Sequence, residues 1–132
     1  MSFIKINPST VNKLSLILLL VGIHSFVVGL LLIIRPDNVF SFFGFNMVNE
    51  PFFPFQGGIF HIIMSIGYIL GALNPDRFSG LIIFSIIVKI SAAVLLTFYF
   101  FITGSALIIL LSGIADGLMG LFIYLIYKHE RF

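Results

Sequence analysis

The chain has 132 residues, 60% of them hydrophobic and only 9% charged, with a mean hydropathy of +1.21. Globular domains carry about 25% charged residues, so this composition excludes an ordinary water-soluble domain. The formal charge of +2 comes from scattered basic residues without a basic run, which gives no indication of nucleic-acid binding. The absence of cysteine excludes disulfides, thiolate metal sites and thiol redox chemistry.

Four apolar stretches are each long enough to cross a bilayer, which takes about 20 residues. They are predicted at 14–34, 54–73, 81–101 and 106–126, and together they make residues 1–132 a single transmembrane domain. Lys5 and Lys13 precede the first stretch, as in a signal peptide, but the stretch is too long and no cleavage pattern follows. We expect it to remain as a membrane helix, capped at its start by the segment Asn7-Pro8-Ser9-Thr10.

The first connection, residues 35–53, is long and rich in phenylalanine. Asp37-Asn38 is interpreted as a cap and Val39–Phe45 as a short segment that lies in the membrane interface or folds over the mouth of the bundle. A lipid-anchoring loop and a gating lid both fit this composition. The aromatic residues are Phe40, Phe42, Phe43, Phe45, Phe52 and Phe53.

The two later connections are short and contain strong helix breakers. Asn74-Pro75-Asp76 separates the second stretch from the third, and Thr103-Gly104-Ser105 separates the third from the fourth. Short connections make consecutive helices antiparallel neighbours. The predicted fold is therefore an all-α integral membrane four-helix bundle with up-down-up-down topology and a Phe-rich interfacial first loop.

Basic residues outside the spans predict the orientation. Arg35 alone falls on one side, and by the positive-inside rule the other side is cytoplasmic. This predicts a multi-pass protein of the cell membrane, in a bacterium the inner membrane, with both termini in the cytoplasm. The residues on the cytoplasmic side are Lys5, Lys13, Arg77, Lys128 and Arg131.

Each span carries a strongly polar residue near its middle: His24, His61, Lys89 and Asp116. At 1.5 Å rise per residue all four lie within about 5 Å of the bilayer midplane. A charge at this depth costs on the order of 3 kcal/mol or more, so such residues are paired, functional or both.

Helical spacing indicates that these residues converge. The polar and small residues of each span share one face, and lipid cannot satisfy polar groups, so we expect these faces to point inward. The first span departs from this pattern: His24 shares its face with Val28 and Arg35, while Gly22, Ser25 and Gly29 mark an adjacent packing face. The other stripes are Gly57, His61, Ser65 and Tyr68; Ser85, Lys89 and Ala92 or Ala93; and Ser112, Asp116, Gly120 and Tyr124.

Lys89 and Asp116 are predicted to pair, because they lie at similar depth on adjacent antiparallel helices. The pair could act only as a link that sets helix register. Alternatively it could form a proton-labile or anion-binding site, because a desolvated lysine exchanges its proton more readily. The candidate ligand- or proton-binding residues are His24, His61, Lys89, Asp116, Ser65 and Tyr68.

The two mid-span histidines allow several interpretations. Each could be a hydrogen-bonded packing residue, and together with Asp116 they could form a proton relay. Bis-imidazole ligation of haem b by His24 and His61 is a further option, although any two histidines in a bundle would permit it. No metal-ligand spacing is present, so no metal site is predicted.

Glycines at seven-residue spacing mark one face of the first span, Gly22 and Gly29, and one face of the fourth, Gly113 and Gly120. Small residues at this spacing allow close helix approach. They are candidate contacts for a homo-oligomer or for a larger membrane complex.

The segment Gly57-Gly58-Ile59-Phe60-His61, followed by Gly67-Tyr68 and Asn74-Pro75-Asp76-Arg77, resembles small bacterial four-span proteins described as BphX-like or DoxX-like. Val88-Lys89 and Asp116 are similar to recurring positions of these proteins. The resemblance covers about residues 14–126 and implies the four-helix membrane fold. DoxX-like proteins are associated with membrane redox systems, particularly quinone-linked ones, but the resemblance implies no catalytic residue.

Three functions remain open on this evidence. The first is binding of a small ligand or proton at the mid-membrane polar pocket. The second is an accessory subunit of a membrane redox or transport complex, with a purely structural Lys89–Asp116 pair. The third is an enzyme acting on a lipid-soluble substrate such as a quinone, with His61 or Asp116 as the acid–base group.

Overall fold

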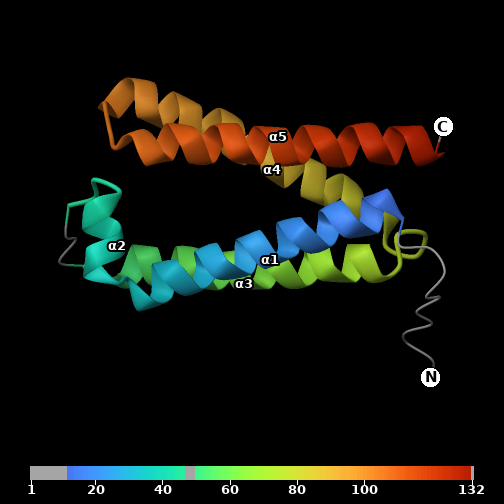
Figure 1. Ribbon diagram of the computed structural model, residues 1–132, viewed down its shortest axis with the longest axis horizontal. Coiled ribbons are helices and arrows are strands. Elements are labelled where there is room, and N and C mark those ends of the chain that lie inside the picture. The colour runs from blue at the N-terminus through green and yellow to red at the C-terminus, as the bar shows by residue number, and fades with distance from the viewer. Residues whose placement is uncertain (1–11, 47–49, 132) are drawn as a thin grey trace.

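The computed structural model describes residues 12–46 and 50–131, and this part of the chain is helical without any strand. Four helices are long and apolar enough to cross a membrane, which confirms the four predicted helices and the all-α class. The last helix continues about five residues beyond the predicted end at 126. The helices are α1 (Lys13–Ile34), α2 (Asp37–Phe42), α3 (Phe52–Leu73), α4 (Ser79–Thr103) and α5 (Leu107–Arg131) (Figure 1).

The predicted breaks end the helices as expected. Asn74 follows the last residue of α3, and its Oδ1 accepts a hydrogen bond from the Arg77 backbone N–H at 3.1 Å, which closes the turn into α4. Gly104 ends α4 with a φ of 60°, a left-handed conformation that glycine adopts without steric cost. The predicted cap at Asn7–Thr10 lies outside the described residues.

The long helices form two closely packed pairs, α1 with α3 and α4 with α5, and far fewer contacts join the pairs. Glycines make the close packing possible. A Cβ at Gly58 would lie 2.7 Å from the Gly29 carbonyl oxygen, and a Cβ at Gly120 would lie 3.1 Å from Lys89 Cβ. The glycine faces predicted as contacts between copies are therefore covered, at these positions, by a helix of the same chain.

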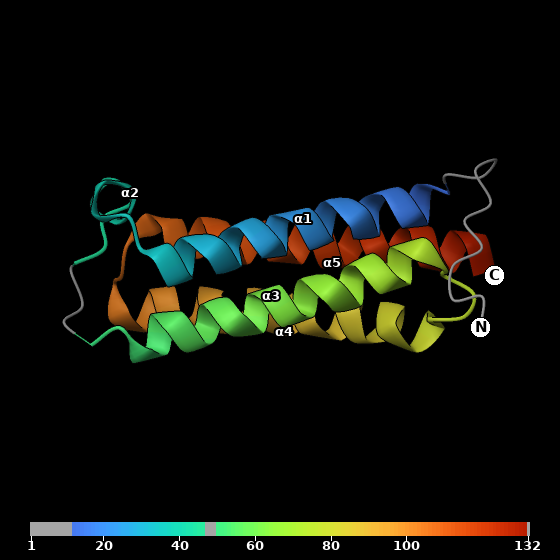
Figure 2. The ribbon, with the colours of Figure 1, turned by 90° about the horizontal axis from the view of Figure 1, so that it is seen from below.

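The two pairs meet at one end of the molecule and diverge towards the other, where α2 lies (Figure 1). Seen from the perpendicular direction, α1 lies over α5 and α3 over α4 (Figure 2). The buried apolar core occupies the end where the pairs meet, because its members come from the first turns of α1 and α4 and the last turns of α3 and α5. They are Leu14, Leu18, Val21, Tyr68, Ala72, Ile82 and Ile123.

Helix α2 covers the end where the pairs diverge. Arg35 ends α1 with a φ of 51°, a left-handed conformation unusual for a residue other than glycine, and so turns the chain towards α5. The chain leaves α2 through Gly44, which has a φ of 80° and lies beside Ala106, just before the start of α5. The Phe-rich segment therefore lies over the mouth of the bundle, one of the two predicted positions, and its position in the membrane interface stays a prediction. Asp37 is the first residue of α2 and Pro36 its N-cap, so the prediction of Asp37-Asn38 as a cap was wrong.

Candidate functional site: a buried ion pair between α4 and α5

Lys89 and Asp116 form a direct hydrogen-bonded ion pair, as predicted from their depth. Lys89 Nζ on α4 donates to Asp116 Oδ1 on α5 at 2.5 Å. The two residues are only 2% and 7% exposed. Lys89 sits opposite Gly120, where the missing side chain lets its stem pass close to α5. Removing either partner would leave a buried charge without compensation, so the two residues depend on each other.

Tyr68 links this ion pair to the other pair of helices. Its side chain is buried on α3, and Lys89 Nζ lies 5.6 Å from the centroid of its ring. A cation at this distance is attracted to the negative face of an aromatic ring, by about 0.5–2 kcal/mol depending on solvation. The sequence placed Tyr68 among the candidates through its helical spacing, and the structure adds that it contacts Lys89 directly.

The buried serines of the bundle differ in their hydrogen bonds. Ser65 Oγ donates to the Ile62 carbonyl oxygen at 2.6 Å, and Ser85 Oγ donates to Leu81 O at 2.7 Å, so both are satisfied within their own helices. Ser65 therefore has its donor occupied, which weakens its candidacy as a ligand-binding group.

Ser25 on α1 was predicted to lie on a packing face but was not counted among the candidate site residues. It is 1% exposed, and its Oγ makes no hydrogen bond of standard geometry to the described residues. The Tyr68 hydroxyl lies close enough to interact with it, which connects Ser25 to the aromatic ring beside Lys89. Its signal in the sequence was its position between Gly22 and Gly29, on the small-residue face of α1.

The two histidines flank the ion pair without sharing its burial. His61 is half-buried on α3, with its Cβ against the Gly29 backbone, whereas His24 on α1 is exposed. Both lie within electrostatic reach of Lys89 and Asp116. The expectation that all four polar faces point inward was therefore wrong for His24, because α1 turns its glycine face, and not its histidine face, towards α3.

The polar stripe predicted on α5 is also only partly buried. Asp116 and Gly120 are buried, whereas Ser112 and Tyr124 are exposed. Ser112 lies one turn from Asp116 and lines a cavity of about 340 Å³ under α2. On α1 the same cavity is lined by Val28, one turn from His24. The cavity therefore extends from α2 to within one helical turn of Asp116 along the chain of α5.

The geometry suits proton chemistry better than metal chemistry. In the part of the chain that the structure describes, no group of three histidine, aspartate or glutamate side chains is placed to hold a metal ion. The ion pair brings a proton donor into direct contact with a proton acceptor, in surroundings that exclude water. Comparison with protein-family models, curated proteins and solved structures gave no match, so the interpretation rests on this geometry alone.

Proposed function

We propose that this chain is a multi-pass membrane protein that binds and exchanges a proton at the Lys89–Asp116 pair. The observation that carries the proposal is the direct contact of two buried, oppositely charged titratable groups on α4 and α5, with Tyr68 of α3 beside them. Intramembrane ionisable residues are rare and are by default functional candidates.

A proton would reach the pair from the side of the cavity. Ser112 lines the cavity and stands one turn from Asp116 on α5, so a hydroxyl lies between the cavity and the charged layer. His61 and His24 are the exchanging groups next to the pair in this proposal, because imidazole changes charge near neutral pH.

The proposed orientation places both termini and the α3–α4 turn in the cytoplasm and α2 outside. It is supported by the distribution of basic residues, with Lys13, Arg77 and Lys128 at the end where the pairs meet and Arg35 at the other. A bacterial inner membrane would fit this orientation.

The exposed apolar side chains do not favour the accessory-subunit function, because any bundle in lipid needs them. The enzyme function would require a substrate at His61 or Asp116, and no contact in the structure selects one. We therefore base the proposal on the ion pair, and not on the resemblance to DoxX-like proteins.

The proposal is tested by measuring the protonation of the Asp116 carboxyl directly. The chain has three aspartates, so protein with ¹³C-labelled aspartate carboxyls in lipid nanodiscs gives a countable set of signals, and Asp116→Asn identifies the one from the site. We expect the Asp116 signal to change protonation with pH while the helix content stays constant, and to titrate differently in Lys89→Met. A signal that stays constant over the whole range in which the bundle is folded would show that the pair only links helices.

A further inference from the structure

The cavity under α2 has the features of a ligand site of its own. Its volume of about 340 Å³ lies in the range of small-molecule sites, roughly 300–1,000 Å³. Its walls come from α1, α2, the start of α3 and α5, so the fold and not one flexible loop defines it. We propose that this cavity binds an uncharged, lipid-soluble molecule that carries a hydroxyl or carbonyl oxygen.

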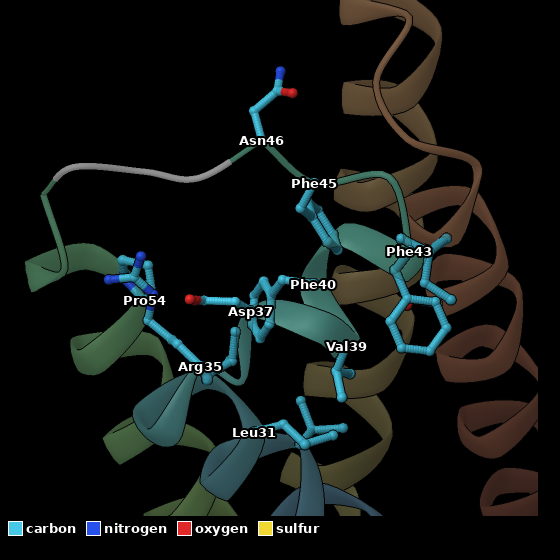
Figure 3. Close-up of a pocket in the computed structure, with 13 residues that line it drawn as sticks. Leu31, Arg35, Asp37, Val39, Phe40, Phe43, Phe45, Asn46 and Pro54 are labelled. Carbon is cyan, nitrogen blue, oxygen red and sulfur yellow. The ribbon is translucent and has the colours of Figure 1, made fainter.

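The lining of the cavity selects an apolar body. Phe40, Phe43 and Phe45 cover it from α2 and the turn that follows, above Leu31 of α1 (Figure 3). The rings of Phe40 and Phe45 are packed on each other, with their centroids 5.7 Å apart. Aromatic side chains offer large flat contact surfaces at low conformational cost, which suits a ring or a stiff chain.

The charges at the cavity argue that the head of the molecule is neutral. Arg35 and Asp37 both line it, and they carry opposite charges. Because the two charges offset each other, an ionised head of either sign would gain little net attraction for the hydration that it loses. A hydroxyl costs less to remove from water, and it can both accept and donate a hydrogen bond.

The turn that places α2 over the cavity contains a residue in an unfavourable backbone conformation. Arg35 adopts a left-handed conformation, which is unfavourable by about 1–2 kcal/mol for a residue with a Cβ. Strained residues of this kind gather at ligand-binding sites, where the surrounding structure maintains them. The turn at Arg35 directs the chain so that α2 lies over the cavity.

The test uses the absence of tryptophan from this chain. Phe40→Trp places a single fluorophore in the cavity wall, with Phe43→Trp as a second variant in case the first does not fold. The control is Phe101→Trp, because Phe101 lies near the end of α4 that faces α2 and is 73% exposed. Each variant is placed in nanodiscs of unbrominated phosphatidylcholine. The quenchers are a dibrominated long-chain alcohol, the sulfate ester of that alcohol and a dibrominated phosphatidylcholine.

We expect the alcohol to quench the cavity tryptophan with saturation at low mole fraction, and the control only weakly and in proportion to concentration. The sulfate should bind roughly fivefold less tightly, because its charge loses hydration without a net attraction from Arg35 and Asp37 together. Val28→Phe fills the cavity and should remove the saturable phase, whereas Lys89→Met with Asp116→Leu should leave it unchanged. The last result keeps this inference separate from the proton proposal.

Three results would overturn the inference. Equal quenching of the cavity and control tryptophans would mean that no site exists. Equal quenching by the brominated phosphatidylcholine and the alcohol would mean that ordinary lipid tails fill the cavity. Tighter binding of the sulfate than of the alcohol would refute the argument for a neutral head.

Discussion

The contact between α1 and α3 at Gly58 allows a sharp test of the packing. A Cβ added by Gly58→Ala would lie 2.7 Å from the Gly29 carbonyl oxygen and 2.6 Å from Ile33 Cγ1, whereas ordinary van der Waals contact begins at 3.4 Å. The carbonyl belongs to the backbone and cannot rotate away, so α1 and α3 would have to separate by several tenths of an ångström. Overpacking of this kind costs about 1–3 kcal/mol.

The matched control is Gly67→Ala on the same helix, where an added Cβ has no neighbour within 4 Å. Alanine is a better helix former than glycine by about 0.5–1 kcal/mol, and this gain applies to both variants. We therefore expect Gly58→Ala to lower the free energy of unfolding by about 1–2 kcal/mol after that gain, and Gly67→Ala to leave it unchanged or raise it. The measurement is unfolding by sodium dodecyl sulfate in mixed micelles, followed by circular dichroism. Equal stabilities of the two variants would refute the close contact between α1 and α3.

Three further predictions concern the charges, the orientation and the histidines. Lys89→Met should lower the free energy of unfolding by about 3–5 kcal/mol near neutral pH, because it leaves Asp116 buried and unpaired. The loss should be smaller at low pH, where protonation neutralises that carboxyl. Adding Asp116→Leu should restore most of the lost stability, and a double variant as unstable as Lys89→Met alone would contradict this. In this cysteine-free chain, Asn38→Cys should react with a membrane-impermeant maleimide in intact cells and Asp76→Cys only after permeabilisation; the reverse pattern would invert the proposed orientation. Purified protein titrated with haem should show no absorption spectrum of bis-histidine ligation, because His24 is exposed and His61 half-buried, so the two do not face a common buried space. A spectrum that saturates at one haem per chain would instead establish haem binding by these histidines.

The helices and their limits follow from local properties of the chain. Long apolar stretches need internal hydrogen bonds in lipid, and Asn74 and Gly104 stop them, so hydropathy and helix breakers were sufficient to predict all four. The Lys89–Asp116 pair was also predictable. The rise of a helix converts sequence position into depth, and two opposite charges at one depth on adjacent helices have a strong reason to meet.

It was much less predictable which face of each helix packs against other helices and which faces lipid. An apolar side chain is equally stable against lipid and against another helix, so the sequence pattern of a membrane helix gives little information on which side is packed. Small residues decided the matter for α1, whose Gly22–Gly29 face packs on α3. For this reason Ser25 is buried and His24 exposed, although the two are neighbours in the sequence.

By itself, the sequence determined a chain of four membrane-length helices with one charged layer, because burial of charge and of backbone polar groups follows from composition and spacing. Only the tertiary structure decided that the helices pack as two pairs that diverge beneath α2. That arrangement depends on the close contacts of a few glycines, and on the strained turn at Arg35 that carries α2 towards α5. The cavity exists because these distant segments meet, and no local pattern encodes their meeting.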